Sequence, residues 1–460
     1  MWQYFTGKQP LTLTVFACGA FATYVILAII TGRCLYADGS YYLLRVLQAG
    51  TFTEMISNRS FAVYLFQLPV VAAIKLGITN IHWMTLAFGI GCFCSWPVAM
   101  LLCYRMAPQH FWVVMLACAA GYLNAAFMAV GEHIVAHAFF WPALFAILFV
   151  RPLNLPAAVI LLLTAGLLIR SYESLLFLGP PLVVLLVWRM ITGRETPWQQ
   201  VVLGTAAVFF AMAAYFAWEG VCHPSDPGNY GAFTQGPLSE LRFPTWTIQM
   251  SYFWGVLILA LKSPQVVRLL RQRIGSILLG CAVLLWGGWP LLVPEQLNPV
   301  GQYESRFLDL LVPLALMPAA VSLAIKPQWL AAQKQDLVRL SACMLIAQSL
   351  WQVSATWQWQ GYVRNWRNLL STQKGPIDLS KIYGNRNSDG GQALRFDWPW
   401  ANPCMSLMLG PDKVQALIMP GRTLLWQPFN PLEPQSLPNL QRYGLDYTQY
   451  IEALQRPKAK

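Results

Sequence analysis

Charge is scarce in this 460-residue chain, where Asp, Glu, Lys and Arg together make up only 11% of the residues. Soluble domains carry about 25% charged residues, so this scarcity excludes an ordinary soluble enzyme and a disordered chain. Hydrophobic residues make up 57% of the sequence and aromatic residues 13%, and the mean hydropathy is +0.47. These values predict a polytopic membrane protein whose aromatic rings favour the membrane interface.

Cysteine and histidine give no clear metal or disulfide pattern. Most of the ten cysteines fall inside apolar segments, where we expect them to pack. Cys34, Cys222 and Cys404 fall outside these segments, and one disulfide among them is left open. His133 and His137 have the spacing of a two-histidine metal face, but no third ligand lies nearby in the sequence. We therefore expect packed, hydrogen-bonded histidines and predict no metal site at this pair.

Long apolar segments recur along the chain, and a helix needs about 20 such residues to cross a bilayer. We predict eleven spans, near residues 13–31, 84–104, 111–130, 134–150, 155–169, 174–190, 200–218, 249–262, 276–293, 308–325 and 340–356. The further apolar segment 61–79 contains Gln67, Pro69 and Lys75. We expect that segment to form an interfacial or re-entrant helix rather than a full span.

The distribution of charge over the loops predicts the orientation. Alternation of the spans places twelve basic residues on one face against only Glu195 and Asp336, so that face is cytoplasmic. The net charge of +12 is therefore an orientation signal and does not indicate nucleic-acid binding. The predicted fold is an all-α membrane module over residues 1–356, with a small extracytoplasmic α/β domain over residues 357–460. We expect a bacterial inner membrane, with the N-terminus in the cytoplasm and this last domain in the periplasm.

Ionisable residues gather at the predicted outer face, where their cost at membrane depth makes them functional candidates. They are Asp38 after the first span, Glu132 and His133 before the fourth, Arg170 and Glu173 between the fifth and sixth, and Tyr303, Glu304 and Arg306 at the start of the tenth. Each also has an ordinary explanation. Asp38 could cap a helix, Arg170 and Glu173 could form a surface pair, and Arg306 could snorkel to the interface.

In this order, the residues resemble the GT-C superfamily of membrane glycosyltransferases, and within it the protein mannosyltransferase and aminoarabinose transferase group. The similar features are Asp38 with Tyr41-Tyr-Leu-Leu and Gly50, the segment Leu68-Pro-Val-Val-Ala-Ala-Ile-Lys-Leu-Gly77, Glu132 with the apolar run to Arg151, Leu167-Leu-Ile-Arg170, and Arg306-Phe-Leu-Asp-Leu-Leu-Val-Pro313. The resemblance covers roughly residues 13–325. Gly39 and Ser40 stand where many relatives carry a second acid, which weakens the case for a divalent cation but leaves one open.

The resemblance implies an inverting glycosyltransferase that takes a sugar from a polyprenyl-phosphate donor at the outer membrane surface. Its acceptor would be a lipid, glycan or protein of the cell envelope. In this scheme Asp38 is the base or orients the acceptor, Arg170 and Arg306 clamp the donor phosphate, and Glu132 orients the sugar or the arginines. His133, Glu173, Glu304 and Tyr303 would support these groups.

Two other classes of function remain as alternatives: a transporter or flippase of a lipid-linked glycan, and a noncatalytic assembly subunit. Transporters tend to show internal repeats and polar residues near the middle of the membrane. This sequence shows no internal repeat, and its unusual charges lie at the outer ends of the predicted spans, which favours the enzyme. The outer loop 219–248 is rich in Gly and Pro and is predicted to be either a mobile lid or a plain surface loop.

Overall fold

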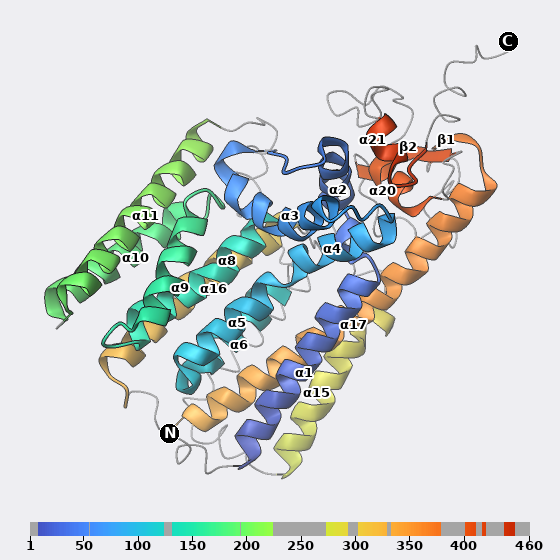
Figure 1. Cartoon of the computed structure of the whole chain (residues 1–460). Coiled ribbons are helices and arrows are strands. Elements are labelled where there is room, and N and C mark those ends of the chain that lie inside the picture. Colours follow the sequence, from blue (N-terminus) through green and yellow to red (C-terminus); the bar gives the residue numbers. More distant parts are fainter. Residues whose placement is uncertain are drawn as a thin grey trace.

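The computed structural model describes residues 8–54, 56–123, 131–193, 195–223, 273–292, 302–328, 333–378, 401–410, 416–419 and 437–446, most of them helical. In chain order (Figure 1), the described elements are α1 (Lys8–Ile30), η2 (Arg33–Leu35), α2 (Asp38–Ala49), η3 (Ser57–Arg59), α3 (Ser60–Lys75), α4 (Ile81–Phe93), α5 (Ser95–Met106), η4 (Pro108–His110), α6 (Phe111–Ala117), η5 (Cys118–Tyr122), α8 (Glu132–Phe149), α9 (Leu155–Leu168), α10 (Leu175–Thr192), α11 (Pro197–Cys222), α15 (Arg273–Leu292), α16 (Gln302–Ile325), α17 (Lys334–Thr372), β1 (Gly375–Asp378), α20 (Asn402–Leu409), β2 (Ala416–Met419) and α21 (Leu437–Gln441).

Several helices are long and apolar enough to cross a membrane. Within the described residues, four meet that standard: Thr12–Ile30 of α1, α8, α10 and α11. The pair α4 and α5 adds a fifth if the two helices form one bent span, and α9 and the Leu310–Ile325 part of α16 are shorter apolar helices. The structure thus supports a helical membrane protein with four to five candidate spans. The predicted span at 249–262 and the lid segment from residue 224 onward lie outside the described residues.

Helix α8 lies at the centre of the bundle. In α8, 89% of the apolar window is buried inside the protein, against 28% for α1 and 33% for α10 and α11. Helices α5, α9 and α16 pack against α8 (Figure 1). On the outer helices, large apolar side chains such as Val15, Val184 and Val201 are more than 60% exposed. Such an apolar exterior suits contact with lipid rather than water.

The predicted span at 84–104 is divided in two. Helix α4 ends at Phe93, α5 begins at Ser95, and the two axes meet at 43°. Pro97 in the first turn of α5 has no backbone N–H to donate to the carbonyl of Phe93, four residues earlier. This missing hydrogen bond explains why the helix bends at Cys94 rather than running straight.

Helix α3, which covers most of the apolar segment 61–79, is too short to cross the membrane alone. Its 16 residues measure about 24 Å, against about 30 Å for the hydrocarbon core. Gln67 is buried and is paired with Thr53, whose backbone N–H and C=O both bond the Gln67 side-chain amide, at 2.9 and 3.0 Å. This pairing accounts for a polar residue in an apolar helix and agrees with the expectation that α3 is not a full span.

Helix α17 extends well past residue 356, where the last span was predicted to end. It continues to Thr372 because Trp359, Tyr362 and Trp366 are buried at helical spacing, and Trp359 packs edge-on against Tyr36. Beyond it, β1 and β2 pair in parallel, with Gly375 opposite Ala416. Strand β2 is formed by the short apolar run Ala416–Met419. Figure 1 shows this sheet with α2, α20 and α21 at one end of the bundle.

Candidate functional site

Asp38 is placed by an unusual turn between α1 and α2. The backbone of Ala37 has φ 51°, a conformation that non-glycine residues rarely adopt, and Asp38 follows it as the first residue of α2. Strained backbone of this kind concentrates at functional sites and costs about 1–3 kcal/mol, which surrounding contacts must offset. Helix α2 has apolar residues at helical spacing, a pattern typical of a helix on the membrane surface. Instead it is buried on most sides, because α20 and α21 pack against it as well as α3.

The central feature of the site is a chain of contacts that joins three segments distant in sequence. The Tyr42 hydroxyl of α2 donates to Glu132 Oε1 at 2.6 Å. Arg59, which precedes α3, lies 3.5 Å from Glu132 Oε2 through Nη1. Its Nε donates to Glu173 Oε1 at 2.8 Å. We call Tyr42, Arg59, Glu132 and Glu173 the acid–arginine cluster.

Burial makes this cluster more than a surface ion pair. The side chains of Arg59 and Glu173 are 16% and 17% exposed, and that of Glu132 is 6% exposed. Burial together with the charge of Glu132 raises the pKa of Tyr42 well above its ordinary value. For Arg59, burial alone would lower the pKa, but the carboxylates of Glu173 and Glu132 outweigh it and raise the pKa. Tyr42 therefore stays protonated and Arg59 stays charged.

Asp38 belongs to the same electrostatic neighbourhood, because its charge also raises the pKa of Tyr42. Tyr42 lies four residues after Asp38, so the two project from the same face of α2. With one arginine and three acids, the group of Asp38 and the cluster carries a formal charge of −2. Such a site attracts cations and hydroxyl donors rather than anions. A phosphate bound nearby would need positively charged groups from outside this site.

An aromatic and histidine layer supports the cluster from the side of α8. The Arg59 guanidinium lies 5.0 Å from the centre of the Tyr172 ring, within the range of a cation–π contact. Tyr172 also packs against His133, with ring centres 5.5 Å apart. His137 is 1% exposed, and its Nε2 lies 2.9 Å from the Ser174 hydroxyl. The expectation of a packed, hydrogen-bonded histidine is confirmed for His137.

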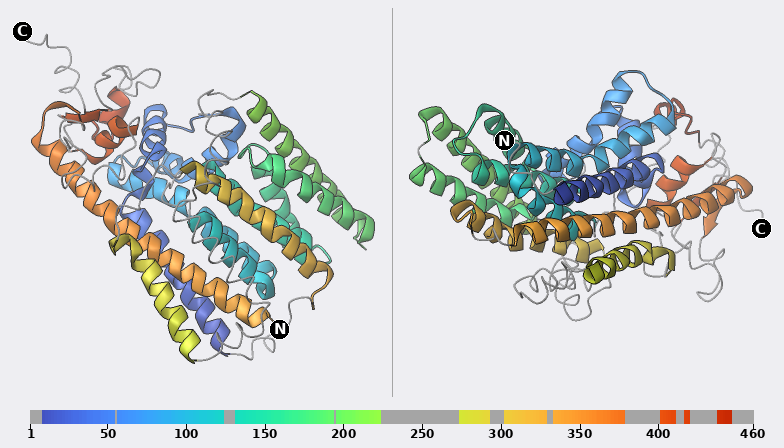
Figure 2. Two further views of the ribbon diagram at one scale, coloured as in Figure 1. Left: turned by 180° about the vertical axis from the view of Figure 1, so that it is seen from behind. Right: turned by 90° about the horizontal axis from the view of Figure 1, so that it is seen from below.

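The remaining predicted site residues are placed differently. The half-buried Arg170 directs its guanidinium over the Phe216 ring of α11, at 4.5 Å, and within the described part of the chain it forms no ion pair with the acids of the acid–arginine cluster. Its backbone carbonyl accepts from the N–H of Phe61, which ties the 170–174 loop to the start of α3. Tyr303, Glu304 and Arg306 belong to the first turns of α16, and their side chains lie outside the described residues. Figure 2 shows that α16 begins at the end of the bundle where α3 lies.

The donor set does not form a metal centre. Within the described ranges, no group of three His, Cys, Asp or Glu side chains is close enough together to hold a metal ion. All ten cysteines are free thiols, so the disulfide left open among Cys34, Cys222 and Cys404 is not formed.

Sequence reasoning missed Arg59, which turns out to connect the two glutamates. The sequence contained one relevant signal. Arg59 is a basic residue on the predicted outer face, where the positive-inside rule predicts few basic residues. It also stands in the triplet Asn58-Arg-Ser60, which has the form of a glycosylation site. Such triplets are common by chance and do not indicate a role for Arg59. Tyr42 appeared only within a longer apolar stretch, and nothing in its spacing predicted a bond to Glu132.

Comparison with known proteins adds no relative: no family model matches the chain, and neither the curated proteins nor the solved structures contain a match.

Proposed function

We propose that the protein is a membrane glycosyltransferase that moves a sugar from a polyprenyl-phosphate donor to an acceptor at the outer surface of the cytoplasmic membrane. The proposal includes the GT-C-like arrangement of about eleven spans and the extracytoplasmic α/β domain. One observation carries it: Asp38, Tyr42, Arg59, Glu132 and Glu173 converge where α2, α3 and α8 meet, at one end of an apolar bundle. Polar groups gathered at one end suit a lipid-linked substrate whose tail stays in the membrane.

In the proposed reaction, a hydroxyl or amine of the acceptor attacks the anomeric carbon of the sugar. A new bond forms at that carbon as its bond to the phosphate oxygen breaks, so the configuration inverts. The carboxylate of Asp38 takes the acceptor proton, and polyprenyl phosphate leaves with the electron pair. The negative charge around Asp38 suits this step, because it favours removal of a proton from the acceptor.

The acid–arginine cluster acts in this scheme as a positioning element. Arg59 holds both Glu132 and Glu173, and Tyr42 fixes the second oxygen of Glu132, so that Glu132 presents a fixed carboxylate to the sugar hydroxyls. The leaving phosphate needs cations that are not already neutralised by acids. We assign the binding of the leaving phosphate to Arg306 and Arg170. To reach the phosphate, the Arg170 side chain has to move away from the Phe216 ring.

A flippase for a lipid-linked glycan is the competing proposal from another class. A flippase requires a polar route through the membrane for the sugar. The acids of the candidate site lie instead at a helix start or in the segments between helices, as Asp38, Glu132 and Glu173 do. This placement favours group transfer at one surface over transport across the membrane.

The test is mass spectrometry of surface lipids, glycans and glycoproteins from cells that carry the wild-type gene, a deletion, or single variants. We expect the deletion and Asp38→Asn to lack the same sugar. Glu219→Gln is the matched control, because Glu219 is an exposed acid in the last turn of α11, and this variant should retain the sugar. If the deletion removes a sugar that Asp38→Asn keeps, the catalytic assignment is wrong. If no sugar changes in the deletion, the enzyme proposal is wrong.

A further inference from the structure

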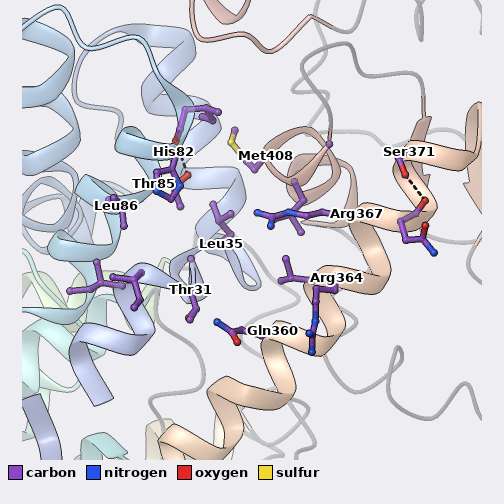
Figure 3. Close-up of a pocket in the computed structure, with 18 residues that line it drawn as sticks. Thr31, Leu35, His82, Thr85, Leu86, Gln360, Arg364, Arg367, Ser371 and Met408 are labelled. Atoms are coloured by element: carbon purple, nitrogen blue, oxygen red, sulfur yellow. Dashed lines mark hydrogen bonds between the residues drawn. The ribbon is translucent and has the colours of Figure 1, made fainter. Parts of the chain in front are cut away.

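A second polar feature at this end of the molecule is a pocket on the side of α17. Its volume is about 860 Å³, within the usual range for ligand sites. Figure 3 shows two facing walls: Gln360, Arg364, Arg367 and Ser371 of α17 on one side, and residues of the α1–η2 turn and α4 on the other. Met408, Leu409 and Gly410, at the end of α20, contribute the remaining lining.

The α17 wall is cationic and is not neutralised by acids. Gln360, Arg364, Arg367 and Ser371 follow one another at four, three and four residues, so they share one face of the helix. Both guanidinium groups belong to exposed residues, and none of the residues that line the pocket is Asp or Glu. Over the described ranges, neither arginine forms an ion pair with a carboxylate. The pocket therefore presents to a ligand two positive charges that no carboxylate of the described ranges neutralises.

The opposite wall is largely apolar, with Thr31, His82 and Thr85 as its polar members, and it continues toward the membrane. Ile29, Ile30, Leu35 and Leu86 line it. Ile30 is 55% exposed, and Ile26, one turn earlier on α1, is 58% exposed, so the apolar strip leaves the pocket along the surface of α1. Because Thr12–Ile30 is one of the candidate spans, this strip leads from the level of the headgroups into the hydrocarbon region.

A ligand that fits both walls must carry a compact anion at one end and an apolar chain at the other. We propose that the pocket binds an acidic phospholipid of the surrounding membrane. Arg364 and Arg367 hold the phosphodiester, for which the arginine fork is well suited, and the Gln360 amide offers a hydrogen bond to the headgroup. One acyl chain lies along Ile30 and Ile26. This site is separate from the acid–arginine cluster and does not depend on the proposed reaction.

The lipid would have a structural consequence. The pocket lies where the outer half of α17 and the end of α20 face α1 and α4. A phosphate held between the two arginines would remove their mutual repulsion. It would also link the part of α17 that lines the pocket, Gln360–Ser371, to α1 and α4. Binding to the folded protein alone raises its stability in proportion to the logarithm of lipid concentration.

The experiment measures binding and thermal stability of the full-length protein in a neutral detergent. The probes are short-chain phosphatidylglycerol, phosphatidylcholine of the same chain length, and inorganic phosphate. We expect phosphatidylglycerol alone to raise the melting temperature. The double variant Arg364→Gln/Arg367→Gln should weaken that binding about tenfold or more, since each charged hydrogen bond contributes well over the thermal energy. Arg442→Gln, which removes an exposed arginine outside the pocket, should bind as wild type.

Three results would overturn the proposal. Equal stabilisation by phosphatidylcholine would mean that the acyl chains alone are recognised. Equal stabilisation by inorganic phosphate would mean that a simple anion site is present rather than a lipid site. Unchanged phosphatidylglycerol binding in the double variant, with a melting temperature like that of wild type in plain detergent, would place the lipid elsewhere. None of these readouts requires sugar transfer, so failure here is distinct from failure of the proposed function.

Discussion

Arg59 is the residue on which the geometry of the candidate site most depends, and a double-mutant cycle tests it. The Arg59 Nε to Glu173 Oε1 distance is 2.8 Å, and both side chains are about one-sixth exposed, at 16% and 17%. Fully exposed pairs contribute about 0.2–1 kcal/mol, and breaking a fully buried pair costs about 3–5 kcal/mol. The partial exposure places the coupling between these limits, at about 2 kcal/mol for contacting residues.

Two other charged pairs should show smaller coupling energies. Arg59 and Glu132 are 3.5 Å apart, and Tyr42 already bonds that glutamate, so we expect a coupling of about 1 kcal/mol. The control is Arg339 with Asp336, a 3.9 Å pair on α17 in which the arginine is 36% and the aspartate 7% exposed. Because this pair is long and its arginine is solvated, we expect a coupling of about 0.3 kcal/mol. Arg59→Gln alone should cost about 3 kcal/mol, because it leaves two carboxylates facing each other without their cation.

The assay is the free energy of unfolding in mixed micelles, measured by denaturant titration for wild type, each single variant and each double variant. Arg59→Gln with Glu173→Gln gives the first coupling, and Arg339→Gln with Asp336→Asn gives the control. A coupling for Arg59 and Glu173 no larger than that of the control would refute the reasoning, because it would mean that the pair behaves as a solvated surface contact.

Three further predictions concern stability. Because burial and the charge of Glu132 raise the pKa of Tyr42, the folded protein binds that proton more tightly than the unfolded chain does. The unfolding free energy should therefore fall as pH rises above about 10, and less steeply in Tyr42→Phe. Arg189, fully buried at the other end of α10, bonds three backbone carbonyls at 2.8 Å, so Arg189→Gln should cost about 3–5 kcal/mol without altering transfer per folded molecule. Gly91→Ala should cost about 3 kcal/mol by denaturant titration, since its new Cβ would overlap the Phe66 carbonyl. The control Gly19→Ala, inside α1 with open space around it, should instead raise the unfolding free energy by up to about 1 kcal/mol.

The helical elements of the bundle followed from sequence because apolar runs and proline positions act locally. Helices α8, α9 and α10 begin and end within a few residues of their predicted bounds. The end of α17 was misplaced for a different reason: beyond residue 356 its helix is amphipathic rather than apolar. There Trp359 packs against Tyr36, and α20 also packs against α17. A hydropathy pattern detects a continuous apolar run, such as that of α8, and does not detect the amphipathic continuation of a helix.

The candidate site was predictable in its acids but not in its connections. Asp38, Glu132 and Glu173 stand out because acids are rare in this chain. Their arrangement depends on Arg59, which reaches Glu132 and Glu173 from another segment, 73 and 114 residues away in sequence. Arg170 was expected in the same cluster, but the ring of Phe216 on α11 offers its guanidinium a closer partner. Contacts of this length in sequence require the folded structure.

Transfer by the purified protein tests the central claim most directly. The protein is placed in nanodiscs with polyprenyl-phosphate mannose or polyprenyl-phosphate aminoarabinose and an extract of cell-envelope acceptors, and the release of polyprenyl phosphate is measured. We predict release by wild type and by Glu219→Gln with one of these donors, and a loss of about 100-fold or more in Asp38→Asn, the range expected for removal of a general base. Release by Asp38→Asn at the wild-type rate, or none by wild type with either donor, would contradict the account.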